Sequence, residues 1–144
     1  MKKSIPEIIG GLLTLLFAYT AMSKLFTFHQ FESVLHRSPV ISNYSVLLAV
    51  LTLAMELVIV LLLLLPQTLR IGLIASVLLL TVFTAYLVFM VLTDSDLPCS
   101  CGGVIQQLGW RRHIVFNGFF ILLGVAGIYV QRQSKTIINK YDMR

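Results

Sequence analysis

The chain has 144 residues, of which 58% are hydrophobic and 12% are charged, and its formal net charge at pH 7 is +5. A soluble globular domain carries about 25% charged residues, so this chain has too little polar surface to cover a water-soluble particle. Its basic residues do not alternate with aromatic residues along a polar segment, which argues against a nucleic-acid-binding surface. We therefore expect one domain, residues 1–144, embedded in a lipid bilayer.

Four apolar runs follow one another, each close to the roughly 20 residues that a helix needs to cross a bilayer. Backbone groups cannot stay unpaired in lipid, so runs of this length form helices. Short links and an even number of spans predict an all-α membrane protein, a four-helix up-down bundle with both termini on one side. The predicted spans cover residues 5–26, 44–65, 69–92 and 113–130.

The basic residues predict the orientation of these spans, because Lys and Arg are enriched in cytoplasmic segments. Seven of them fall on the side of the two termini, and four fall on the opposite side. Both termini and the Pro66 turn are therefore predicted to be cytoplasmic. The segment 27–43 then lies outside, where its phenylalanines suggest an amphipathic stretch resting on the membrane surface.

Glu56 is the only acidic residue well inside a predicted span, and it lies near the middle of the bilayer. A carboxyl group there either hydrogen-bonds the helices to one another or carries protons along a functional path. Lys24 lies near the outer end of the first span, where it either extends to the headgroups or points inward toward the cysteine segment and favours a thiolate or an anionic quinol. The candidate hydrogen-bond partners of Glu56 are Thr14, Thr20, Thr81 and Tyr86.

The two cysteines of the chain, Cys99 and Cys101, flank a single serine between the third and fourth spans. With this segment outside, disulfides can form and persist. A bridge between residues i and i+2 closes a very small, strained ring, and strained disulfides are those that exchange easily. Such a bridge constrains little of the unfolded chain, so it is a poor structural staple. The spacing favours thiol–disulfide exchange.

Two other interpretations of the cysteine pair stay open. Two thiolates with His113 as a third ligand suit zinc or copper, although a fourth ligand is missing. Alternatively, the pair consists of two small residues without chemistry.

The start of the fourth helix supplies three further candidate site residues, Trp110, His113 and Asn117. Their spacing places them on one helix face beneath the cysteines. Trp110 suits an interfacial anchor, and His113 can carry protons near neutral pH. Asn117 lies one turn deeper, where its amide needs a hydrogen-bond partner, and a structural bond between helices explains it equally well.

These features together resemble the MauE/DoxX group of bacterial inner-membrane proteins. The resemblance rests on Ala21-Met22-Ser23-Lys24 at the end of the first span, the mid-span Glu56, and C-x-C-G-G followed by W-x-x-H-x-x-x-N. In that group, MauE is associated with methylamine utilisation and with disulfide formation in a periplasmic dehydrogenase subunit. DoxX-type relatives are associated with quinone-linked sulfur oxidation. The resemblance implies membrane-bound redox chemistry with Cys99 and Cys101 as its centre.

We therefore expect an inner-membrane thiol–disulfide redox protein that acts on an exported or membrane-bound redox partner. The cysteines would exchange electrons, His113 would move protons, and Lys24 and Glu56 would support charge and proton transfer. A quinone is the candidate cofactor. The alternatives are a non-catalytic membrane subunit that anchors or assembles a redox enzyme and, with less support, a metal-handling protein.

Overall fold

The computed structural model describes residues 4–37, 42–93 and 109–142, and these residues are almost entirely helical. The elements are α1 (Ser4–Phe26), α2 (Phe28–Arg37), the short 3-10 helix η1 (Ser42–Tyr44), α3 (Ser45–Leu64), α4 (Leu69–Thr93) and α5 (Gly109–Asp142). Cys99 and Cys101 lie outside the described residues. In the described part of the chain the architecture is all-α, as predicted.

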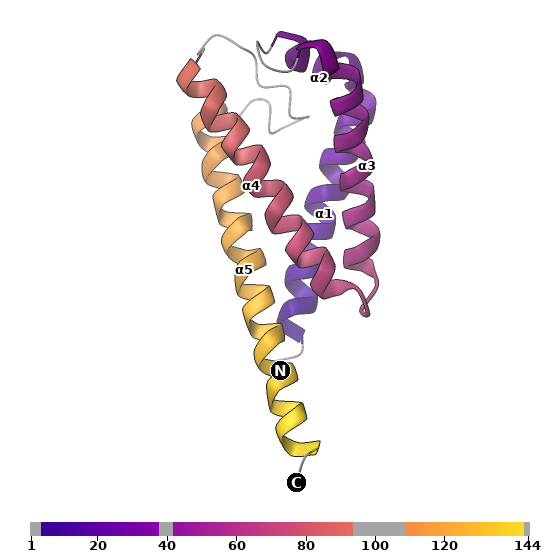
Figure 1. Cartoon of the computed structure of the whole chain (residues 1–144), viewed down its shortest axis with the longest axis vertical. Helices are drawn as coiled ribbons and strands as arrows, with labels where there is room; N and C mark the ends of the chain where they lie inside the picture. Colours follow the sequence, from indigo (N-terminus) through magenta and orange to yellow (C-terminus); the bar gives the residue numbers. More distant parts are fainter. Residues whose placement is uncertain (1–3, 38–41, 94–108, 143–144) are drawn as a thin grey trace.

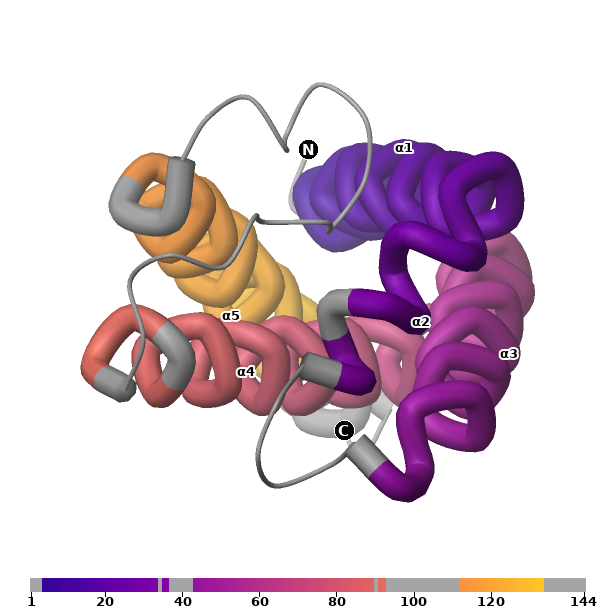
Figure 2. The backbone as a smooth tube through the Cα atoms, turned by 90° about the horizontal axis from the view of Figure 1, so that it is seen from above, coloured from indigo at the N-terminus to yellow at the C-terminus, as the bar shows by residue number. Residues whose placement is uncertain are grey.

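The four long helices form an up-down bundle (Figure 1). α1 packs along α3 and α4 packs along α5, while α1 against α5 and α3 against α4 close the ring. Seen along the bundle, α2 lies across the end of this ring (Figure 2). The beginning of α1 and the end of α5 lie at the opposite end, so the two ends of the bundle carry different parts of the chain.

Pro66 determines where α3 stops. The residue before it, Leu65, has extended backbone angles of φ −90° and ψ 120°, as proline requires of its predecessor. Thr68 then satisfies carbonyl groups that the helix end leaves open, because its hydroxyl donates to Leu62 at 2.9 Å and its N–H donates to Leu65 at 3.1 Å. The resulting tight turn makes α3 and α4 antiparallel neighbours.

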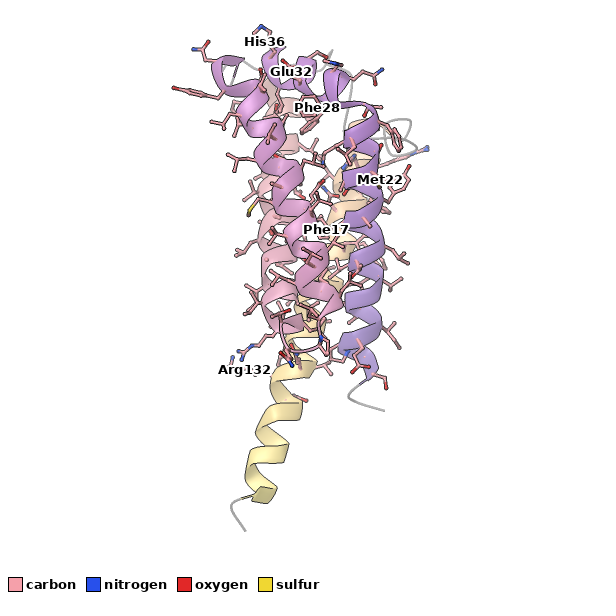
Figure 3. The ribbon with its side chains drawn as sticks, turned by 90° about the vertical axis from the view of Figure 1, so that its right-hand side faces the viewer. Phe17, Met22, Phe28, Glu32, His36 and Arg132 are labelled. Carbon is pink, nitrogen blue, oxygen red and sulfur yellow. The ribbon has the colours of Figure 1, made fainter. Side chains whose placement is uncertain are left out.

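Four described helices are long and apolar enough to cross a membrane: Ser4–Phe26, Ser45–Leu64, Leu69–Phe89 and Arg112–Gln133. Their outward-facing side chains are mostly large and apolar, among them Leu15, Leu61 and Leu122, which suits contact with lipid rather than water. Figure 3 shows Phe17 directed into the bundle and Met22 directed outward from α1. The protein is a multi-pass membrane protein.

The fourth helix is longer than its predicted span. The apolar run predicts residues 113–130, whereas α5 extends from Gly109 to Asp142. Apolar length determines how much of a helix can lie in lipid, but it does not determine where the helix ends. The additional turns of α5 project past the other helices at the end that carries the termini (Figure 1).

The segment after α1 was expected to be an amphipathic stretch resting on the membrane surface, and in the structure it forms α2, which packs on the bundle. Thr27 interrupts the helix, and its carbonyl accepts the N–H groups of Gln30 and Phe31 at 3.0 Å, which starts α2. Phe31 and Leu35, four residues apart on one face, are buried against α3. The apolar face of α2 therefore covers the end of the bundle, where α4 runs away from α3 (Figure 1).

Candidate functional site

The structure gathers four of the predicted site residues at the α2 end of the bundle. Lys24, Glu56, His113 and Asn117 are all buried, and all of them line one cavity. Trp110 lies on α5, but its side chain is outside the described part, as are Cys99 and Cys101. The cysteine segment joins the end of α4 to the start of α5, and Gly109 precedes His113 by four residues, about 6 Å of helical rise.

Lys24 and Glu56 form a buried ion pair between α1 and α3, in which Lys24 Nζ donates a hydrogen bond to Glu56 Oε1. The side chain of Lys24 is 5% exposed and that of Glu56 is 1% exposed. Helix direction explains how residues at different depths meet, because side chains lean toward the N-terminus of their own helix. On antiparallel helices Lys24 reaches toward the middle of the bundle and Glu56 reaches toward α2.

Aromatic rings surround the Lys24 ammonium group. Its Nζ lies 5.3 Å from the ring centroid of Phe31 on α2 and 4.9 Å from that of Phe83 on α4. Both distances are within the range of a cation–π interaction, which strengthens when the cation is desolvated. Three helices besides α1 thus contribute to holding one cation inside an apolar bundle.

The carboxyl group of Glu56 is only partly satisfied. Its Oε1 accepts the hydrogen bond from Lys24 and a longer one, at 3.4 Å, from the hydroxyl of Thr20. Its Oε2 is buried and has no hydrogen-bond partner within the described residues. An unpaired carboxyl oxygen is costly in a low-dielectric interior, so Oε2 retains the capacity to accept a hydrogen bond.

A cavity of about 270 Å³ lies beside this pair. Its walls come from α1, α2, α3, α4 and α5 and are largely apolar, with His113 and Asn117 one turn apart on α5. Val82 also lines the cavity while 62% of its surface is exposed on α4, so the cavity reaches the lipid-facing side of the bundle. The remaining lining residues are Leu16, Phe17, Thr20, Phe31, Leu35, Leu48, Thr52, Leu80, Phe83, Tyr86, Leu87 and Phe116.

Sequence reasoning identified the members of this site but not its central contact. Of the four partners expected for Glu56, Thr20 forms the hydrogen bond, and Tyr86 lines the same cavity. Lys24 does not extend to the headgroups: it points into the bundle, where its ionic partner is Glu56, and the expected orientation toward the cysteine segment concerns residues outside the described part of the chain. The pairing of Lys24 with Glu56 could have been predicted from the sequence, since charged residues inside a membrane pair with one another. Phe31 was recognised only as part of an amphipathic stretch, and nothing distinguished Phe83 from the other phenylalanines of the apolar runs.

Comparison with known proteins assigns the chain to a family. The family model described as "Methylamine utilisation protein MauE" matches residues 2–130. The chain belongs to the MauE family. Searches of curated proteins and of solved structures found no significant match. The matched range includes three of the apolar helices in full, the fourth as far as Val130, the cavity and the cysteine segment of this MauE-family protein.

No group of three His, Cys, Asp or Glu side chains that could hold a metal ion occurs in residues 4–37, 42–93 and 109–142. The polar side chains that line the cavity are an ammonium group, a carboxyl group, an imidazole and an amide, together with the hydroxyls of Thr20, Thr52 and Tyr86. Such a set can bind and protonate an organic molecule, and it can stabilise a negative charge that develops on one.

Proposed function

We propose that this MauE-family protein is a thiol–disulfide oxidoreductase of the bacterial inner membrane, with Cys99 and Cys101 as its redox pair. One observation carries the proposal: the buried Lys24–Glu56 pair lies in a cavity, together with His113, at the bundle end where the cysteine segment connects α4 to α5. Charged groups inside a membrane are costly and mark functional paths. Beside a redox pair at the membrane face, Lys24, Glu56 and His113 would support the transfer of charge and protons.

The proposed reaction oxidises an exported partner. A partner thiolate attacks one sulfur of the Cys99–Cys101 disulfide and forms a mixed disulfide, which a second partner thiolate then resolves. The partner gains one disulfide, and the two cysteines take up two electrons and two protons. The small ring of an i, i+2 disulfide favours this direction, because strained disulfides are stronger oxidants. The family description makes an exported component of methylamine utilisation the first partner to test.

The distribution of charge supports a periplasmic position of the cysteines. Arg132 lies at the end of the bundle opposite α2 (Figure 3), and Arg70 follows the turn between α3 and α4. Basic residues favour the cytoplasmic side, so the α2 end is proposed to face the periplasm. Membrane-impermeant maleimide should label Cys99 and Cys101 in intact, reductant-treated cells. Labelling only after the cells are broken would place the pair inside and contradict the proposal.

The test of function compares Cys99→Ser/Cys101→Ser with Ser100→Ala, which changes the same segment but keeps both thiols. Alkylation of free thiols followed by electrophoresis reports the redox state of exported proteins in each strain. We expect reduced partner to accumulate only in the double variant. If every exported protein keeps its disulfides in the double variant, the redox proposal is wrong. Co-purification of a partner with that variant would then favour a non-catalytic assembly subunit.

A further inference from the structure

The cavity at the α2 end has the size and surroundings of a binding site for one small ring. Its volume of about 270 Å³ is just below the roughly 300 Å³ at which small-molecule pockets begin. A ring fits this space, whereas a long hydrocarbon tail must remain outside. The exposed position of Val82 gives such a tail a way into the surrounding lipid.

The polar atoms in the cavity suit a ligand that changes between hydrogen-bond acceptor and donor. Lys24 has three N–H donors, and one of them is used by Glu56 Oε1. Glu56 Oε2 accepts and lacks a partner within the described residues. A quinone presents two carbonyl acceptors, and its reduced form, the quinol, presents two hydroxyl donors. A cation beside an open carboxyl oxygen can therefore bind both forms.

We propose that this cavity binds the ring of a lipid-soluble quinone, with Lys24 and Glu56 as its polar contacts. The aromatic rings of Phe31 and Phe83, which lie beside Lys24 Nζ, provide faces on which a planar ring can stack. The inference rests on the proposed function for its electron donor, but ring binding itself does not require the cysteines.

The quinone supplies the oxidant that the proposed reaction needs. The reduced Cys99 and Cys101 thiols together lose two electrons and two protons as the S–S bond forms. The quinone takes up two electrons and two protons, and both of its C=O groups become C–OH groups. An N–H of Lys24 stabilises the negative charge that develops on one ring oxygen, and Glu56 Oε2 accepts a hydrogen bond from the new hydroxyl.

The test measures binding of a decyl-substituted benzoquinone to the purified full-length protein in lipid nanodiscs, with empty nanodiscs as the blank. Thr52→Phe places a ring inside the cavity that Thr52 lines. The matched control, Thr81→Phe, makes the same change at an exposed position of α4, outside the cavity lining. We expect Thr52→Phe to weaken binding at least about 10-fold and Thr81→Phe to change it less than about twofold. Thr52→Leu, a smaller addition, replaces Thr52→Phe if that variant does not fold.

Two results would overturn the inference: no binding above the empty-nanodisc blank, or binding that substitutions at Thr52 leave unchanged. The Cys99→Ser/Cys101→Ser variant separates this inference from the proposed function. It should bind the quinone with wild-type affinity and be unable to reduce it. If that variant still supports normal partner oxidation while substitutions at Thr52 weaken quinone binding, the quinone site is supported and the proposed function is wrong.

Discussion

The two ends of the bundle are packed in different ways. From the middle of the bundle to the end that carries the termini, glycines let helices touch: a Cβ added to Gly124 would lie 2.5 Å from Val77 Cγ2, and one added to Gly10 would lie 2.6 Å from Leu69 Cδ1. Leu13 and Leu73 are fully buried nearby. At the α2 end, aromatic side chains and a buried ion pair surround a cavity instead.

This difference indicates a division of labour along one set of helices. Lipid gives helices no hydrophobic reason to associate, so small residues that permit close contact stabilise the bundle. Close packing also leaves no room for a ligand. The end with the glycines therefore holds the helices together, while the end with Lys24 and Glu56 keeps space and charge available for chemistry.

The largest effect is expected from breaking the ion pair. Lys24→Met leaves the Glu56 carboxylate buried without its counterion, and such changes cost about 3–5 kcal/mol. Lys24→Met/Glu56→Leu removes both charges and should recover most of this loss in stability, while abolishing quinone reduction. Thermal unfolding in detergent, followed by circular dichroism, measures the loss of stability in the single variant and its recovery in the double variant. A single variant as stable as the wild type would show that the pair does not matter for folding.

A smaller loss of stability is expected from filling the space at a glycine where two helices touch. In Gly124→Ala the new Cβ would collide with Val77, a β-branched side chain with little freedom to move away, and overpacking costs about 1–3 kcal/mol. Gly118→Ala, on the same helix, is the control, since nothing lies within 4 Å of its added Cβ. We expect a lower melting temperature only for Gly124→Ala. Equal stability of the two variants would contradict the importance of close contact here.

The smallest effect concerns the hydroxyl beside Glu56. Thr20→Val removes a hydrogen bond to the carboxyl group and one to the carbonyl of Phe17. Thr14→Val removes only a backbone hydrogen bond, to Gly10, on the same helix. The loss in free energy of unfolding should be larger for Thr20→Val than for Thr14→Val by about 0.6 kcal/mol, the average for hydrogen bonds between helices in membranes. Chemical unfolding can resolve this difference. A larger loss of stability for Thr14→Val would contradict a stabilising hydrogen bond from Thr20 to Glu56.

Some parts of the structure were predictable from short sequence signals. Pro66 ends α3 within two residues of the expected position, because proline constrains the backbone before it wherever it occurs. The end of α5 was not predictable, since the polar residues after Val130 are compatible with a helix and have no strong stop signal. The spacing of His113 and Asn117 correctly placed them on one face. That this face lines a cavity was not visible from α5 alone.

The sequence by itself determined the membrane class, the four spans and the isolation of Glu56 in a span, because lipid requires long apolar helices and makes each charge within them conspicuous. It also brought the two cysteines together in one connecting segment. Only the tertiary structure decided that Lys24 turns inward to Glu56, that α2 covers the bundle with Phe31 and Leu35, and that a cavity remains beneath it. These features depend on how antiparallel helices aim their side chains and where they diverge, and no local pattern in the chain encodes either.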